Sequence, residues 1–174
     1  MNKISIIFVA IVLIFTTVKA DEPDQYQEKV KTLDSTLATL YGVISGEAGE
    51  ERDWDLFHYL FAADARLIPS FKDKEGKITY QSLTPAGYVE RSGKWLVENG
   101  FYEIEIAREV DKFGPVVQVF STYESYHSKK DKEPFMRGIN SIQLLNDGER
   151  WWVLNIYWSQ ESEENPIPKQ YLPK

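Results

Sequence analysis

The sequence contains no cysteine and only two histidines, His58 and His127. Without cysteine the chain forms no disulfide, offers no thiol nucleophile and has no thiolate ligand for a metal ion. Two imidazoles also leave little material for a metal centre or for a histidine-based catalytic triad. We therefore expect the protein to work without a metal ion and without a cofactor.

Positive charge is also scarce. The chain has 20 Lys and Arg residues against 27 Asp and Glu residues, which gives a formal net charge of −7. A surface this acidic repels nucleic acid and anionic lipid. The composition therefore argues against nucleic acid as a partner.

Long apolar runs are absent except for one, which covers residues 4–18. This run follows the basic start Met1-Asn2-Lys3 and ends at Val18-Lys19-Ala20, which places small residues at the −3 and −1 positions of an export signal. We predict a signal peptide over residues 1–20, cleaved after Ala20, and a secreted or periplasmic location. An uncleaved membrane anchor is the alternative, but the run is shorter than the roughly 20 apolar residues that span a bilayer.

Residues 21–174 remain after this cleavage, and their length fits one domain that buries enough surface to fold without disulfides. Loss of Lys3 and Lys19 takes the formal net charge from −7 to about −9. No later stretch is apolar enough to span a bilayer, and no cysteine is present to carry a lipid. We therefore expect no membrane association once the signal is removed.

Three segments in the first half of the chain have the pattern of helices. Residues 30–44 place apolar side chains three and four positions apart, which is the spacing of one helical face. A second, shorter helix is predicted from about Arg52. A third is predicted from Thr84-Pro85, where threonine caps free amides and proline suits the first turn. The third helix carries Trp95 and ends at Asn99-Gly100, because glycine tolerates a left-handed turn.

Strand patterns dominate the second half. Residues 65–69 predict a brief strand that Pro69 ends, followed by a charged loop over residues 71–77. From Phe101 onward apolar and polar residues alternate with the period of two of β-strands. Asn146-Asp147-Gly148 predicts a hairpin turn, because these residues accept positive φ. The four long strands are predicted over about residues 102–111, 117–124, 135–145 and 151–159.

Three helices followed by long antiparallel strands predict an α+β domain over residues 21–160. In this domain a strongly curved, mostly antiparallel sheet wraps around the helices. Such curvature leaves a cavity between the helices and the sheet. Residues 161–174 include three prolines and are predicted to form a C-terminal tail.

Two short motifs resemble the signatures of the nuclear transport factor 2-like (NTF2-like) superfamily. They are Leu60-Phe61-Ala62-Ala63-Asp64-Ala65 at the end of the second predicted helix and Gly148-Glu149-Arg150-Trp151-Trp152-Val153-Leu154 at the start of the last strand. The order of elements also matches over about residues 25–160. The resemblance implies a cone-shaped fold around a pocket. It does not single out an activity, because the superfamily includes ketosteroid isomerases, scytalone dehydratase, SnoaL-like polyketide cyclases and many non-catalytic domains.

The resemblance also implies where catalytic residues would lie. The isomerase base would fall five residues after the aspartate that ends the second helix, at Pro69, which cannot take a proton. A histidine of the final strand would fall four or six residues after Trp152, at the apolar Ile156 and Trp158. Tyr41 does match, in roughly the place of the isomerases' oxyanion donor. Isomerisation by that mechanism is therefore disfavoured.

Tyr41 and His58 are the candidate catalytic residues. An imidazole titrates near neutrality, so His58 suits a general acid or base; the alternative is a partly buried helix histidine bonded to a neighbour. Arg137 is the candidate for binding a carboxylate or phosphate, or else it pairs with Glu124 or Glu103 across the sheet. The candidate ligand-binding residues are Tyr41, His58, Trp95, Arg137, Ile156 and Trp158.

Three functions stay open at this point. The first is an exported domain that binds a small apolar molecule in the cone without catalysis, which the apolar residues at the expected catalytic positions favour. The second is a small-molecule dehydratase, isomerase or cyclase of the SnoaL-like type that uses Tyr41, His58 and Arg137. The third is an interaction module that forms a homodimer through the open face of the sheet. A deep pocket that joins those three residues would favour the enzyme, and an empty apolar cone would favour ligand binding.

Overall fold

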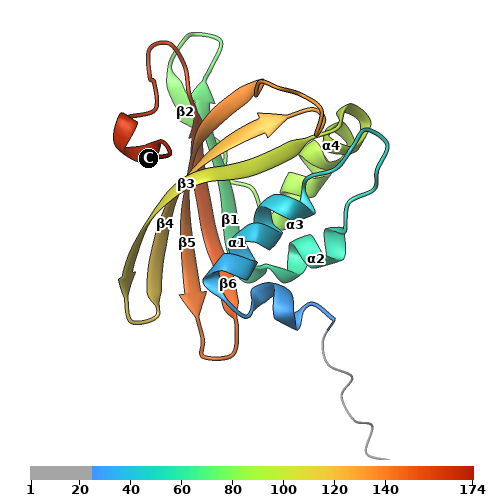
Figure 1. The fold of residues 1–174 in the computed structure, drawn as a ribbon, viewed down its shortest axis with the longest axis vertical. Coiled ribbons are helices and arrows are strands. Elements are labelled where there is room, and N and C mark those ends of the chain that lie inside the picture. The colour runs from blue at the N-terminus through green and yellow to red at the C-terminus, as the bar shows by residue number, and fades with distance from the viewer. Residues whose placement is uncertain (1–24) are drawn as a thin grey trace, which may run out of the picture.

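The computed structural model describes residues 25–174, so the predicted signal peptide and its cleavage site lie outside the described residues. Within this range, no helix is both long and apolar enough to cross a membrane. A layer of short helices packs against a six-stranded sheet (Figure 1).

The helices form where the sequence offers caps. They are a 3₁₀ turn at Gln27–Val30, α1 (Leu33–Val43), α2 (Trp54–Tyr59), α3 (Pro85–Tyr88), a π-helical turn at Val89–Gly93, and α4 (Lys94–Asn99). The side chains of Thr32, Asp53 and Thr84 cap α1, α2 and α3 by accepting hydrogen bonds from backbone amides of the first turn. Helix α4 ends at Gly100, whose φ of 67° glycine adopts without strain. The first and third predicted helices are therefore confirmed.

The second helix is shorter than predicted. Helix α2 ends at Tyr59 and β1 (Phe61–Lys72) follows almost at once, so most of the 60–65 motif opens a strand rather than ending a helix. The prediction that Pro69 ends a brief strand was wrong, because the Pro69 carbonyl accepts a hydrogen bond from the Gln81 amide and the strand continues past it. Proline is tolerated at strand positions whose amide hydrogen is not needed for pairing.

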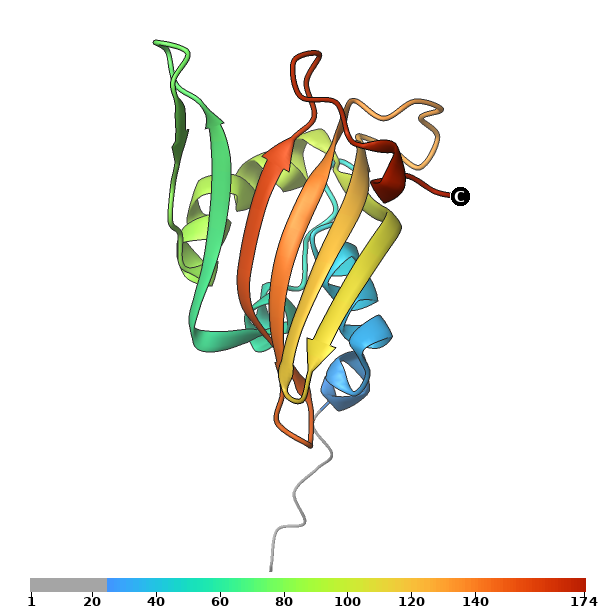
Figure 2. The same cartoon turned by 90° about the vertical axis from the view of Figure 1, so that its left-hand side faces the viewer.

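A six-stranded sheet forms the second layer, in the order β2-β1-β6-β5-β4-β3 (Figure 2). Strands β1 and β6 are parallel, and all other neighbours are antiparallel. Register shifts in three strand pairs mark β-bulges or other irregularities of the ladder, and β-bulges bend and twist a sheet. The predicted α+β class with a curved, mostly antiparallel sheet is confirmed. The remaining strands are β2 (Ile78–Tyr80), β3 (Tyr102–Phe113), β4 (Val116–Tyr126), β5 (Met136–Asn146) and β6 (Trp151–Gln160).

The core lies between the two layers, because the helices cover only one face of the sheet (Figure 1). Leu37 of α1 and Phe57 of α2 are almost fully buried there, together with Val119, Ile142 and Val153 from β4, β5 and β6. Apolar side chains from both layers thus close most of the space that the curved sheet encloses.

A buried guanidinium ties the helical layer together. Arg52 Nε donates a hydrogen bond to the Ile44 carbonyl at 3.0 Å, and Nη2 donates to the carbonyls of Gly46 at 2.8 Å and Leu96 at 3.1 Å. These carbonyls belong to the end of α1, the following loop and α4. Arg52 therefore fixes helices that supply walls of the pocket described below.

The C-terminal tail lies on the outer face of the sheet (Figures 1 and 2). The Tyr171 ring packs against Phe120 of β4 with centroids 4.9 Å apart, and the Thr122 hydroxyl donates a hydrogen bond to the Tyr171 carbonyl. Ile167 is also buried. The tail thus packs on the face opposite to the helices.

Candidate functional site

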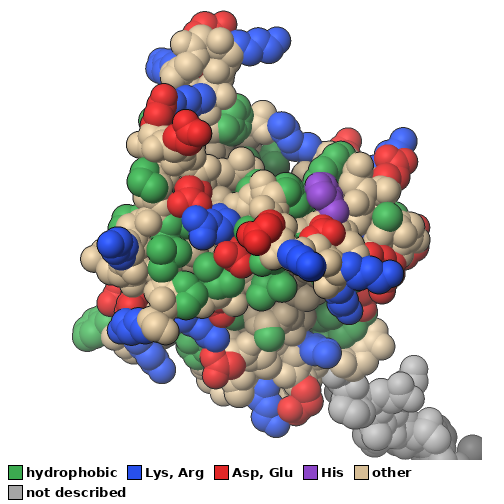
Figure 3. Space-filling model, turned by 45° about the horizontal axis from the view of Figure 1, so that its top comes forward, with side chains coloured by type: hydrophobic (Ala, Val, Ile, Leu, Met, Phe, Trp, Pro, Cys, Tyr) green, Lys and Arg blue, Asp and Glu red, His purple; other side chains and the backbone are tan. Residues whose placement is uncertain are grey.

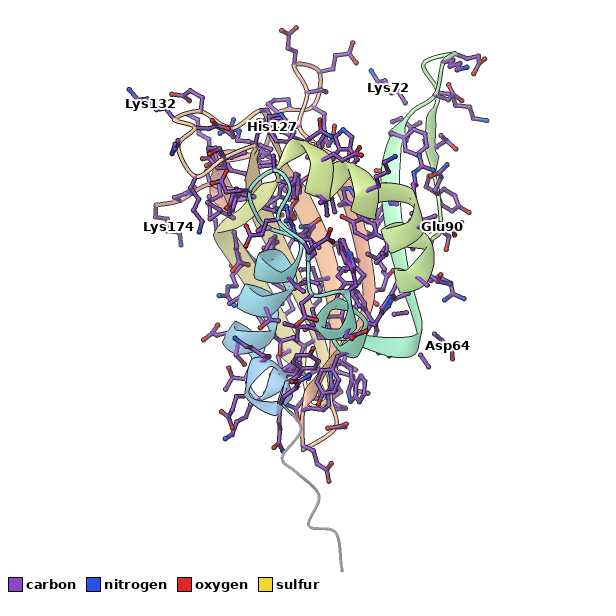
Figure 4. All side chains as sticks on the ribbon, turned by 90° about the vertical axis from the view of Figure 1, so that its right-hand side faces the viewer. Asp64, Lys72, Glu90, His127, Lys132 and Lys174 are labelled. Carbon is purple, nitrogen blue, oxygen red and sulfur yellow. The ribbon has the colours of Figure 1, made fainter. Side chains whose placement is uncertain are left out.

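A pocket of about 240 Å³ lies between the helices and the concave face of the sheet. Most of its wall is aromatic or aliphatic, and the exposed residues Trp95 and Gln160 mark its accessible end. Trp95 contacts the ring of His127, which Figure 4 places at the upper end of the sheet. The aromatic lining residues are Tyr41, Phe57, Tyr88, Trp95, Phe101, Tyr123 and Trp158, and the polar ones are Ser92, Glu103, Asn140 and Gln160.

Charged groups of both signs lie on the top face of the molecule. Figure 3 turns the top of the molecule forward and shows Asp and Glu side chains interspersed with Lys and Arg, with apolar side chains between them. Within residues 25–174, no group of three or more His, Asp or Glu side chains is arranged to hold a metal ion. The features that distinguish the pocket are therefore its aromatic wall and its few polar groups.

Four of the six candidate residues from the sequence line this pocket, namely Tyr41, Trp95, Ile156 and Trp158. His58 does not line it. Its ring is exposed on α2 and meets the Phe57 ring edge-on, with centroids 5.8 Å apart. Helix α2 has six residues and buries only Phe57 fully, so the position beside it faces outward.

Arg137 points to the outer face of the sheet instead of into the pocket. Its Nε donates to a Glu161 carboxylate oxygen at 2.8 Å, and its Nη1 lies 3.9 Å from Glu124. Glu124 is directly opposite Arg137 in the β4–β5 register, and directly opposed residues share a face. Tyr41, His58 and Arg137 therefore do not meet in one pocket. Asp64 is exposed as well, at the outer edge of β1 (Figure 4).

Glu103 is a pocket residue that the sequence did not single out. It lies on β3 opposite Ser125, whose side chain is fully buried, so both point to the concave face. Its neighbour Ile104 is 52% exposed on the other face. Alternation alone does not say which of the two faces inward. The β3–β4 register decides it, and no pattern of residues in the sequence indicates that register.

The Glu103 carboxyl accepts two long hydrogen bonds from neighbouring side chains. Its Oε1 accepts a hydrogen bond from Asn140 Nδ2 at 3.3 Å, and its Oε2 accepts one from the Ser125 hydroxyl at 3.4 Å. Burial raises the pKa of Glu103 to about 7, and these two hydrogen bonds offset only part of that rise. Glu103 is therefore a carboxyl that gains or loses its proton near neutrality.

Tyr41 belongs to a chain of hydrogen bonds that leads away from the pocket. Asn140 Nδ2 donates to the Tyr41 hydroxyl at 3.1 Å, which lies 2.6 Å from Ser121 Oγ. Ser121 donates to Glu105 at 2.5 Å, and Glu105 pairs with Arg108 at 3.1 Å. A serine hydroxyl has one hydrogen, so the Tyr41 hydrogen must be the one that bonds Ser121. The Tyr41 hydroxyl thus has no hydrogen left for a ligand.

Two further tyrosines, Tyr88 and Tyr123, lie near the Glu103 carboxyl. Burial raises the pKa of both phenols, and the charge of Glu103 raises them further. The pKa of Tyr41 is raised by burial and by Glu103 in the same way. All three phenols therefore stay neutral at physiological pH. Neither Tyr88 nor Tyr123 forms a side-chain hydrogen bond to another described residue, so both hydroxyls remain available to a ligand.

No family model matches the chain, and no curated protein matches it. Solved structures do match. One is described as the beta subunit of a proposed aromatic-ring-hydroxylating dioxygenase from Novosphingobium aromaticivorans, with a TM-score of 0.56 and 11% identity over 80% of this chain and 93% of that one. An NTF2-like protein of unknown function from Silicibacter pomeroyi gives a TM-score of 0.53 and 12% identity over 74% and 92%. A protein of unknown function with a cystatin-like fold from Nostoc punctiforme gives 0.55 and 10% over 75% and 89%.

Proposed function

This chain has the NTF2-like fold, and we propose that it is a binding domain whose pocket holds a small, largely apolar molecule without converting it. One observation carries the proposal, namely the pocket of about 240 Å³ whose walls are mainly aromatic and aliphatic. Ligand sites are typically apolar clefts with a few convergent polar groups. Glu103 and Asn140 form such a group here.

The size of the pocket limits the ligand. An apolar cavity of roughly 150 Å³ accepts benzene. A pocket of about 240 Å³ therefore suits a molecule with one ring and a short substituent. We further propose that the domain acts outside the cytoplasm after loss of residues 1–20, because the N-terminal pattern is that of an export signal.

The arrangement of polar groups favours binding over catalysis. Acid–base enzymes commonly place a donor and a base on the same substrate. In this pocket the Tyr41 hydrogen is bonded to Ser121, and His58 and Arg137 lie elsewhere. Glu103 is the remaining pocket group whose pKa lies near neutrality, because the Tyr88 and Tyr123 hydroxyls can donate hydrogen bonds but have raised pKa values. A second candidate function, proton transfer by Glu103 as a lone acid or base, is supported by its pKa of about 7.

The outer face of the sheet supports a homodimer less well. Tyr171 and Ile167 of the tail already occupy part of that face. A second copy would have to pack beside the tail or displace it. We therefore propose that the function depends on the pocket rather than on a homodimer.

A matched pair of substitutions on β6 tests the binding proposal. Ile156→Phe adds volume inside the pocket, whereas Leu154→Phe adds it at an exposed position of the same strand. Toluene titrated into labelled protein, followed by amide chemical shifts, should bind the wild type and Leu154→Phe about equally. It should bind Ile156→Phe at least about tenfold more weakly, a loss of about 1.4 kcal/mol. Equal toluene affinity in all three proteins would show that this pocket is not the binding site.

A further inference from the structure

The pocket holds an acidic group without a basic partner. Of the residues that line it, none is Lys, Arg or His, and Glu103 is the sole carboxylate. The two hydrogen bonds that Glu103 accepts measure 3.3 and 3.4 Å, beyond the usual range of such bonds. The Glu103 side chain is partly buried, with one side toward the pocket and the other toward a groove beside α1. On the pocket side, a carboxylate withdrawn from water is costly unless a cation or strong donors compensate its charge. The neighbouring cation Arg108 is already paired with Glu105.

We propose that the polar group of the ligand is a protonated amine, which pairs with Glu103 while the hydrocarbon part of the ligand packs against the aromatic wall. This inference rests on the proposed function of the pocket. An ammonium group supplies both the missing positive charge and three hydrogen-bond donors. After one donor has bonded Glu103, the hydroxyl oxygens of Tyr88 and Tyr123 can accept the others.

Two further features of the chain favour a cationic ligand. Seven aromatic rings line the pocket, and the faces of such rings attract cations. The formal net charge of −7 also attracts cations toward the protein from solution. Anionic ligands such as carboxylic acids and phosphates would meet Glu103 with no compensating cation in the pocket wall, so we expect them to be excluded.

Proton linkage follows from this pairing. On the pocket side, the titratable groups that face Glu103 are Tyr41 from α1, Tyr88 from α3 and Tyr123 from β4. On the groove side they include the Glu105–Arg108 pair on β3, Asp34 of α1, and Lys129, Asp131 and Lys132 of the loop after β4. Asn140 on β5 does not titrate. The three phenols stay neutral because their pKa values are raised. Glu103 is therefore the group in the pocket wall that changes charge between pH 6 and pH 8.

At any pH where Glu103 is protonated in the empty pocket, binding of the amine must release the Glu103 proton. At pH 6, protonated Glu103 and the ammonium ion give the ion pair and one free proton, whereas at pH 8 Glu103 is already ionised. Glu103 and Tyr41 also line an open groove between α1 and β3, whose charged rim includes Arg108, Lys129 and Lys132. This groove gives the proton a way to solvent while a ligand fills the pocket.

Benzylamine, benzyl alcohol, toluene and benzoate test the inference, because they share one ring and differ in charge. Calorimetric titration at pH 8 should show that benzylamine binds at least about tenfold more tightly than benzyl alcohol, and that benzoate does not bind. The benzylamine affinity should fall about tenfold from pH 8 to pH 6. At pH 6 the measured heat of benzylamine binding should depend on the ionisation enthalpy of the buffer, because the buffer takes up the released proton. At pH 8 it should not.

Two variants assign the effect to Glu103. Glu103→Gln keeps the shape of the side chain and removes its charge. The preference for benzylamine over benzyl alcohol and the pH dependence of benzylamine binding should therefore both vanish. Glu109→Gln removes the same charge from an exposed position of the same strand and should keep both. A preference that survives in Glu103→Gln, or benzoate binding as tight as benzylamine binding, would overturn the inference. Toluene binding without any preference for benzylamine would overturn it and leave the proposed function intact, whereas no binding of any probe would overturn both.

Discussion

At the scale of single residues, the chemistry of the pocket depends on which side chains have a hydrogen or a charge that no neighbouring protein group already binds. Tyr41 matches the place of a catalytic donor, yet its hydrogen is bonded to Ser121 and, through Ser121, to Glu105. Glu103 has no comparable partner, and burial raises its pKa to about 7. Glu103 is therefore the residue of the pocket whose charge changes with pH near neutrality.

The raised pKa of Glu103 predicts how stability depends on pH. The ordinary pKa is 4.5 and the folded-state pKa is about 7, so between these values the folded state holds a proton that the unfolded state has released. The contribution of Glu103 to stability therefore falls as pH rises through this window, by an amount of order 3 kcal/mol. Glu103→Gln removes that contribution. Urea unfolding should show the variant more stable than the wild type at pH 8, with a small difference near pH 4.5.

The exposed Glu109→Gln variant is the control, because its carboxyl lies on the solvent side of the same strand. Its free energy of unfolding should follow the wild type at both pH values. If Glu103→Gln shows the same change between pH 4.5 and pH 8 as the wild type, Glu103 does not titrate in the folded state as described.

At the scale of elements, the sequence predicts strands and turns better than it predicts register. The alternation in residues 102–111 correctly indicates β3, and Asn146-Asp147-Gly148 correctly indicates the hairpin between β5 and β6. Sliding a strand by one residue exchanges its two faces, so alternation leaves open whether Glu103 or Ile104 faces the helices. The bulge after Glu105 shifts the register again. For this reason the polar centre of the pocket could not be found from the sequence.

The junction between α4 and β3 gives a prediction at this scale. Gly100 has a φ of 67°, and a Cβ atom there would lie 2.4 Å from the His127 carbonyl oxygen. Gly100→Ala should therefore lower the free energy of unfolding by about 2 kcal/mol or more, through backbone strain and this clash. Gly42→Ala in α1 is the matched control, because a Cβ there meets nothing within 4 Å and alanine favours helix by about 0.5–1 kcal/mol. Urea unfolding that finds equal effects for both would contradict this account of the junction.

At the scale of the whole molecule, the change of period from helix to strand near Phe101 is enough to predict the two layers. The parallel pairing of β1 with β6 was not predicted, because it joins segments far apart in the chain, such as Leu67 with Ile156. The same long-range pairing brings both of these residues into the pocket wall. The sequence offered pairing of Arg137 with Glu124 as an alternative, and the structure has that pair. The contact of Arg137 with Glu161 was not predicted, because it joins the sheet to the C-terminal tail.

A crystal structure of the protein with 4-bromobenzylamine at pH 8 tests the central claim most directly. The account predicts an anomalous bromine peak inside the pocket between the helices and the sheet, with the ammonium nitrogen within about 3 Å of a Glu103 oxygen. A bromine peak beneath the C-terminal tail or in the groove beside α1, with the pocket filled by protein side chains, would contradict it.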